Sequence, residues 1–287
     1  MSSDPGRASW HGEQVQAVTG GALTVLISPE RGGKIVSLRD REGGEWLCQP
    51  AGALSPPAAP GAVFVDAEMC GWDECAPSTH PCTVGGRPIP DHGDLWTARF
   101  RAGGDGLEAD GTSLGYRFRR RVLPTDAGAR IEYEAQALTD VVPFLWAAHP
   151  QLVAPPGARV ELGEPVEEVV EVLEPGLPRV PFTPDLAEID TVVRGGYRKW
   201  NVPPERAATS VSLIRGPRRL TVRMGPETPY LGIWFDAAAF SNEPTIAIEP
   251  STGYVDALDV AIEQHRATEL VPGRPLSWTI ELEVAPA

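Results

Sequence analysis

Cysteine and long apolar runs are scarce in this chain, and each scarcity excludes a class of protein. Four cysteines among 287 residues, at positions 48, 70, 75 and 82, are too few for a disulfide scaffold, so we expect free thiols in a reducing compartment. No run of about eighteen apolar residues is present, and the stretch MSSDPGRASWHGEQ lacks the apolar core of a signal peptide. These absences predict a soluble, cytoplasmic protein.

Positive charge is scarce as well. The chain has 25 Lys and Arg residues against 39 Asp and Glu residues, which gives a formal net charge of −14. Such a field repels nucleic acid and anionic membrane surfaces, so we expect neither as a partner. Lys34 and Lys199 are the only lysines of the chain. We interpret this scarcity of lysine as a coding bias without mechanistic content.

Turn-forming residues, in contrast, are abundant. Thirty glycines and thirty prolines occur without a Gly-X-Y period, which indicates turns between many short strands. Alternating runs such as YRFRRRV (116–122) and RIEYEAQAL (130–138) predict antiparallel strands with one side in a core. The segment 166–174, VEEVVEVLE, fits a strand better than a short helix because of its valines, and a helical turn is expected only within 255–264.

The sequence shows no internal repeat and no shift in composition that would mark a domain boundary. We expect residues 1–13 to be a flexible lead and residues 14–287 to form a single all-β domain with few short helices. One large antiparallel β-sandwich is the most economical fold, and a barrel is the alternative.

Three residues are candidates for proton transfer. Glu249 follows an apolar alternating run within TIAIEPSTGY (245–254), which is typical of a strand that carries a carboxylate to its end. His92 and His149 lie in comparable settings, each beside a proline or glycine and close to a tryptophan. Histidine can donate a proton near neutral pH and glutamate can accept one. The sequence therefore predicts an acid and a base held on neighbouring strands.

Tryptophans accompany these candidates. Trp72, Trp96, Trp146 and Trp234 each lie within a few residues of a candidate site group. The C–H faces of sugars stack on indole rings, so this company favours a carbohydrate pocket. We include Trp72 and Trp234 among the expected sugar contacts.

The cysteine-rich stretch could also be considered as a metal site. Cys70, Cys75 and Cys82 lie near His80 and His92, but their spacing is irregular and lacks the paired C-x₂-C knuckles of zinc sites. We interpret these cysteines as small apolar residues in and around a loop and expect no metal.

Several segments follow one another in a characteristic order. They are ISPERGGKIVSLRDREGGEWL, GWDECAPS, PDHGDLW, FLWAAHPQL, PYLGIWFD, IAIEPSTGYVDA and ELVPGRPLSWTIELEV. In this order they resemble the first hairpin, substrate-side loop, His-Gly segment, second histidine strand and closing strands of the aldose 1-epimerase (galactose mutarotase-like) superfamily. The resemblance covers most of the chain and rests on the order of the motifs.

The resemblance implies a β-supersandwich with a cofactor-free active site on a concave sheet face. An isomerase of this kind interconverts the α and β anomers of a free aldose. Glu249 would be the general base that takes the proton of the anomeric hydroxyl, and His149 the general acid that protonates the ring oxygen. His92 would bind the same region of a monosaccharide, while Asp190, Trp72 and Asp73 would be substrate contacts.

The chain also departs from the pattern. Asp94 and Leu95 follow the His-Gly segment where many relatives have an arginine, and the net charge is negative, so we expect a neutral aldose rather than a sugar phosphate. A noncatalytic sugar-binding or regulatory module on the same fold is one alternative. A lyase or glycoside hydrolase is another, in which Asp73 or Asp190 supplies a second carboxylate beside Glu249. We expect a monomer or a homodimer.

Overall fold

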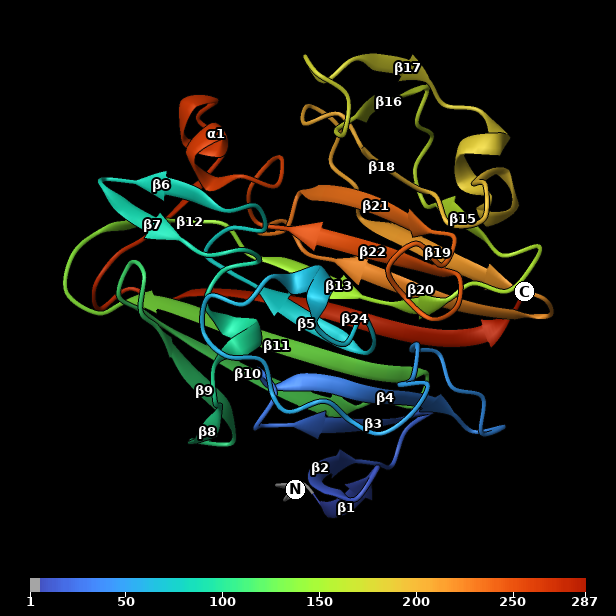
Figure 1. The fold of residues 1–287 in the computed structure, drawn as a ribbon, viewed down its shortest axis with the longest axis horizontal. Coiled ribbons are helices and arrows are strands. Elements are labelled where there is room, and N and C mark those ends of the chain that lie inside the picture. The colour runs from blue at the N-terminus through green and yellow to red at the C-terminus, as the bar shows by residue number, and fades with distance from the viewer. Residues whose placement is uncertain (1–5) are drawn as a thin grey trace.

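The computed structural model describes residues 6–287, which form two large antiparallel β-sheets packed against each other (Figure 1). The strands are β1 Gly6–Trp10, β2 Glu13–Val18, β3 Leu23–Ser28, β4 Lys34–Asp40, β5 Trp72–Cys75, β6 Cys82–Val84, β7 Arg87–Ile89, β8 Arg101–Gly103, β9 Gly106–Gly111, β10 Tyr116–Pro124, β11 Gly128–Ala137, β12 Val142–Phe144, β13 Ala147–Pro150, β14 Leu152–Val153, β15 Arg159–Leu162, β16 Glu168–Glu171, β17 Arg179–Pro181, β18 Tyr197–Asn201, β19 Ser210–Arg215, β20 Arg218–Met224, β21 Tyr230–Asp236, β22 Thr245–Ser251, β23 Thr268–Leu270 and β24 Leu276–Pro286. The helices are α1 Leu258–Glu263 and the short 3₁₀ turns η1 Phe64–Asp66, η2 Leu95–Thr97, η3 Pro184–Ala187 and η4 Ile189–Thr191.

The two sheets differ in size. The larger has twelve strands in the order β1-β2-β3-β4-β5-β13-β22-β21-β18-β16-β17, with β14 paired to β22, and the smaller has eight in the order β15-β19-β20-β24-β11-β10-β9-β8. Two small ribbons, β6 with β7 and β12 with β23, complete the described strands. Neither order closes on itself, so the predicted β-sandwich is confirmed and the barrel alternative is wrong.

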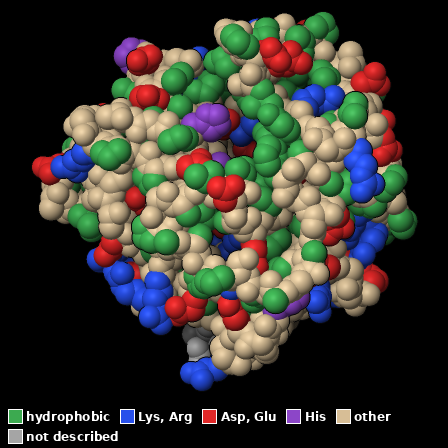
Figure 2. All heavy atoms as spheres, in the orientation of Figure 1, with side chains coloured by type: hydrophobic (Ala, Val, Ile, Leu, Met, Phe, Trp, Pro, Cys, Tyr) green, Lys and Arg blue, Asp and Glu red, His purple; other side chains and the backbone are tan. Residues whose placement is uncertain are grey.

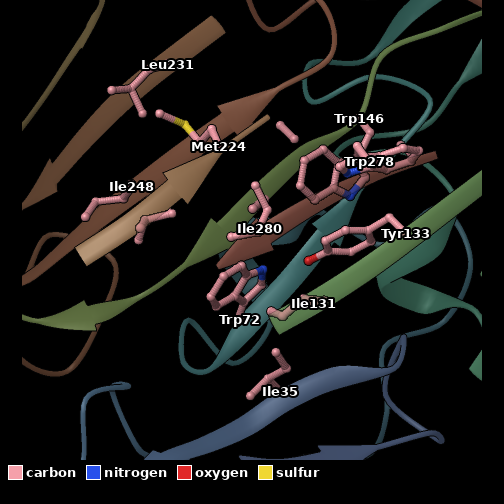
Figure 3. Close-up of a cluster of buried hydrophobic side chains, with 14 of the residues drawn as sticks. Ile35, Trp72, Ile131, Tyr133, Trp146, Met224, Leu231, Ile248, Trp278 and Ile280 are labelled. Carbon is pink, nitrogen blue, oxygen red and sulfur yellow. The ribbon is translucent and has the colours of Figure 1, made fainter. Parts of the chain in front are cut away.

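The hydrophobic core lies between the two sheets (Figure 3). Ile131 and Tyr133 of β11 alternate with partly exposed residues, as the sequence pattern predicted, and point at the larger sheet. The rings of Tyr133 and Trp278 stack with centroids 5.2 Å apart, and Trp72 of β5 lies in the same cluster. Burial of these large side chains holds the sheets together.

Most local predictions are confirmed, and one is corrected. The segment 166–174 contains strand β16, and 255–264 contains helix α1. The predicted flexible lead is wrong for residues 6–10, which form β1 and pair with β2, since Trp10 is buried against Val15 and Val36. Residues 1–5 of that lead lie outside the described residues. Within 6–287, no helix is both long and apolar enough to cross a membrane.

A buried ion pair joins the two sheets. Arg120 of β10 donates to Oε1 of Glu74 on β5 at 2.5 Å, and the two side chains are 1% and 0% exposed. Trp146 Nε1 donates to the other carboxylate oxygen at 2.7 Å, and the Tyr133 hydroxyl donates to Oε1 at 3.3 Å. Both oxygens of the buried Glu74 carboxylate are therefore satisfied by hydrogen bonds.

We expect Arg120→Met to lower the free energy of unfolding by about 3–5 kcal/mol, because it leaves the Glu74 carboxylate buried without a cation. Urea unfolding followed by circular dichroism measures the loss. Arg130→Met is the matched control: Arg130 pairs with Glu281 at 2.6 Å on the exposed face of the neighbouring strand, so its loss should cost about 0–1 kcal/mol. Equal effects of the two substitutions would contradict the prediction.

Candidate active site

Four neighbouring strands of the larger sheet carry the residues of one pocket. β13 pairs with β22, β22 with β21 and β21 with β18, and these strands present His149, Glu249, Trp234 and Lys199. The turn η1 contributes Phe64, and loops contribute further lining residues, which include Asp91, His92, Phe240 and Asp256. The cavity has a volume of about 310 Å³. Figure 2 shows a hollow on this face of the molecule, where histidine, acidic and hydrophobic side chains meet.

Glu249 and His149 form the centre of the pocket. Glu249 Oε1 lies 3.7 Å from His149 Nε2, and both side chains are buried. Oε1 and His149 Nδ1 have no hydrogen-bond partner among the described residues. Buried polar atoms are normally satisfied, so these unsatisfied atoms indicate a place where a ligand or water binds.

Burial shifts the pKa values of Glu249 and His149 in opposite directions. It raises the pKa of Glu249 to about 7, although the charge of Lys199 acts against this rise. Burial also lowers the pKa of His149 well below its usual value, and the nearby His92 and the ammonium of Lys199 lower it further. When the pH falls, the first proton taken up by this pair therefore goes to Glu249.

His92 lies beside the pair and is held from two sides. Its Nδ1 lies 2.8 Å from Asp91 Oδ1, and its ring stacks on Phe64 with centroids 3.8 Å apart. The rings of His92 and His149 meet edge to face at 5.6 Å. Because a carboxylate accepts the Nδ1 proton, the neutral ring of His92 has a free Nε2 lone pair. Burial lowers the pKa of His92 despite the opposing effect of Asp91.

An aromatic wall borders the pocket. The rings of Trp234 and Tyr197 stack 5.0 Å apart, and Phe240 packs against both of them. Trp234 Nε1 is buried and has no partner among the described residues. The wall therefore offers an apolar surface together with an available hydrogen-bond donor.

The structure brings four of the seven expected site residues to this pocket: Glu249, His149, His92 and Trp234. Trp72 lies in the core between the sheets and is 1% exposed, so it cannot reach a ligand in the pocket. Asp190 is in η4, where its Oδ2 accepts the backbone N–H of Gly157. These two predicted substrate contacts are not part of the pocket.

Asp73 also differs from the expectation. It is opposite His149 in the pairing of β5 with β13, but it is fully buried and its Oδ2 lies 3.1 Å from Lys34 Nζ. Burial raises the pKa of Asp73 to about 6, and Lys34 opposes this rise. Asp73 is therefore paired with Lys34 and does not line the pocket.

The cysteines within residues 6–287 are not arranged as ligands of a metal ion. All four are free thiols, and Cys70 and Cys75 are buried. Burial raises the pKa of the Cys70 thiol to about 11. Within residues 6–287, no group of three or more His, Cys, Asp or Glu side chains is arranged to hold a metal ion.

The sequence interpretation missed Lys199 and Asp256. Lys199 Nζ donates to Glu249 Oε2 at 2.5 Å and to Asp256 Oδ1 at 2.8 Å. The available signal was the scarcity of lysine: Lys34 and Lys199 are the only lysines of the chain, and each is buried against carboxylates. Reading them as coding bias overlooked their structural roles.

Comparison with known proteins identifies the fold. No protein-family model and no curated protein matches the sequence. Among solved structures, the Slr1438 protein of Synechocystis sp. PCC 6803 is similar with a TM-score of 0.75 and 13% identity, covering 100% of this chain and 99% of that one. A galactose mutarotase-like protein of Clostridium acetobutylicum has a TM-score of 0.71 and 14% identity, covering 98% of both chains. A candidate aldose 1-epimerase of Escherichia coli K12 has a TM-score of 0.69 and 16% identity, covering 95% and 99%. The chain thus has the galactose mutarotase-like fold, as the sequence resemblance predicted.

We expect the imidazole of His149 to titrate well below the usual histidine pKa, because burial and the nearby ammonium of Lys199 oppose its protonation. Two-dimensional ¹H–¹⁵N NMR of the imidazole nitrogens reports the protonation state, and the His149→Asn variant assigns the signal. A titration midpoint at or above the usual histidine value would contradict this prediction.

Proposed function

We propose that this protein is a cofactor-free aldose 1-epimerase that interconverts the α and β anomers of a neutral free sugar. The observation that carries the proposal is the unsatisfied Glu249 Oε1, which faces His149 Nε2 across 3.7 Å in a pocket with an aromatic wall. One acid and one base at this separation fit the two oxygens at the anomeric centre of a pyranose ring. The fold and the order of the sequence motifs agree with this activity.

The reaction needs only proton transfer. Glu249 Oε1 accepts the proton of the anomeric hydroxyl, the C1–O5 bond breaks with its electron pair moving to O5, and His149 Nε2–H protonates O5. The open-chain aldehyde then rotates about C1–C2. Closure on the other face of the carbonyl restores both protons, with Glu249 as the acid and His149 as the base.

The reactive form of the pair carries one proton. Only this form contains both a base, ionised Glu249, and an acid, protonated His149. In the resting site the same proton resides on Glu249, because burial raises its pKa and lowers that of His149. Transfer of the proton within the pair produces the reactive arrangement without any exchange with solvent.

The lining also favours a neutral sugar. Among the described lining residues there is no arginine, and the only lysine is already bound by two carboxylates. Asp91 and Asp256 add negative charge beside the histidines. A phosphorylated or carboxylated sugar would meet this charge without a free cation, whereas the C–H face of a neutral sugar can stack on Trp234.

We expect Glu249→Gln to slow anomer exchange by about 10²- to 10⁴-fold, because the amide keeps the shape of the side chain but cannot accept the proton. Saturation-transfer NMR between the α and β signals of a panel of free aldoses measures the exchange.

Glu263→Gln, an exposed substitution on α1, is the control and should match the wild type. Exchange by Glu249→Gln at the wild-type rate would show that the base is misassigned. Saturable sugar binding by a wild-type protein that accelerates no exchange would instead support the noncatalytic binding module.

We expect kcat/KM to have a bell-shaped dependence on pH. Activity should fall as the pH rises through about 7, because the pair loses its only proton when the raised pKa of Glu249 is passed. It should fall again at acidic pH, where a second proton removes the base. Exchange rates measured from pH 4 to 9 test the profile, and a rate that keeps rising above pH 7 would contradict a proton donor on His149.

A further inference from the structure

The buried lysine beside Glu249 has no role in the mechanism described so far. The side chain of Lys199 is 5% exposed. Its ammonium nitrogen lies 2.5 Å from Glu249 Oε2 and 2.8 Å from Asp256 Oδ1. Burial of three charged groups is costly unless they are paired with good geometry. Lys199 therefore differs from an ordinary lysine, whose ammonium is solvated at the protein surface.

The backbone makes room for this lysine. In the antiparallel register, Asn201 of β18 is opposite Gly232 of β21, and Gly232 is opposite Glu249 of β22. The Lys199 side chain crosses β21 at this glycine: a Cβ on Gly232 would lie 3.4 Å from Lys199 Cε and 2.7 Å from Asn201 Oδ1. A larger residue at position 232 would narrow the path from one strand to the other.

Lys199 contacts only one of the two carboxylate oxygens of Glu249. Oε2 accepts the hydrogen bond from Lys199, whereas Oε1 faces His149 and has no partner among the described residues. A carboxylate held through one oxygen cannot rotate freely, so only the other oxygen is presented to a ligand. This is the geometry that a base with a single productive orientation requires.

The charges around Glu249 come from several elements. They are Lys199 on β18, His149 on β13, Asp256 after β22, and His80, Asp91 and His92 on the loops between β5 and η2. Asp256 lies close enough to repel an ionised Glu249, and Lys199 is the lining residue whose positive charge offsets both carboxylates. Without that ammonium, the two carboxylates would share one buried site and Glu249 would hold its proton more tightly.

We propose that Lys199 is a positioning residue for the base, which fixes Glu249 Oε2, sets Oε1 toward the substrate and keeps Glu249 ionisable beside Asp256. This inference rests on the proposed function for its consequence in catalysis, but the effect on Glu249 is a property of the free protein. The effect of Lys199 on Glu249 and its consequence for catalysis can therefore be tested separately.

The test compares opposite changes to the same cluster. Lys199→Met removes the ammonium with little change in length, and should move the Glu249 titration to higher pH by about 1–3 units. Asp256→Asn removes the competing carboxylate, and should move it to lower pH. The readout is the ¹³C chemical shift of the Glu249 carboxyl carbon as a function of pH, assigned with Glu249→Gln.

Lys34→Met is the matched control. Lys34 is the other buried lysine, and its Nζ lies 3.1 Å from Asp73 Oδ2 outside the pocket lining. Its loss should lower the melting temperature, as the loss of Lys199 does, but leave the Glu249 titration in place. A general loss of folding would alter all of these variants alike, and circular dichroism monitors it.

Anomer exchange then connects the titration to catalysis. In Lys199→Met, Glu249 holds the shared proton more tightly, so transfer of this proton to His149 is less favourable and kcat/KM at pH 7 should fall about tenfold or more. The alkaline limb should move upward, because the pair loses its proton only at higher pH. A Glu249 titration that is the same in wild type, Lys199→Met and Asp256→Asn would overturn the inference. If Lys199→Met does not fold, Lys199→Gln takes its place, because it also removes the ammonium and should move the Glu249 titration to higher pH. A wild-type protein without exchange activity, but with these shifts, would overturn the proposed function and leave the role of Lys199 intact.

Discussion

The ammonium of Lys199 between two buried carboxylates is the interaction on which the candidate site depends. Glu249 and Asp256 come from one end of β22 and the loop after it, and both would be strongly disfavoured as charges in this pocket without a cation. The cation comes from β18, two strands away, and reaches them over Gly232. The antiparallel register of three strands is therefore a requirement of the proposed chemistry as well as of the fold.

Two buried carboxylates of strand β5 are paired with cations in a similar way. Neighbouring residues of β5 point to opposite faces, so Asp73 meets Lys34 and Glu74 meets Arg120 from the other sheet. β13, the strand of His149, pairs with β5. A charge pair on each face thus steadies the strand next to the candidate acid, which suits a site whose geometry must be fixed before a ligand arrives.

The fold and the centre of the site could be predicted from sequence because their signals are local. Alternation along single strands reveals which residues face a core, and Glu249, His149 and His92 each lie in a recognisable motif. Trp72 and Asp73 show the limit of this reasoning: proximity to a motif does not tell which face of a strand a residue takes. Lys199 shows a second limit, because its partners lie 50 and 57 positions away and are joined to it through register and a glycine.

The choice of lysine at position 199 follows from the shape of the site. Apart from Lys34 and Lys199, this chain uses arginine for its basic side chains, including the buried pair with Glu74. A guanidinium is a wide planar fork, whereas an ammonium is compact and can direct its three donors to separate acceptors. Lys199 has to pass a narrow point beside Gly232 and then serve two carboxylates on different segments. The compact ammonium of Lys199 meets both demands, because it passes beside Gly232 and still reaches two acceptors.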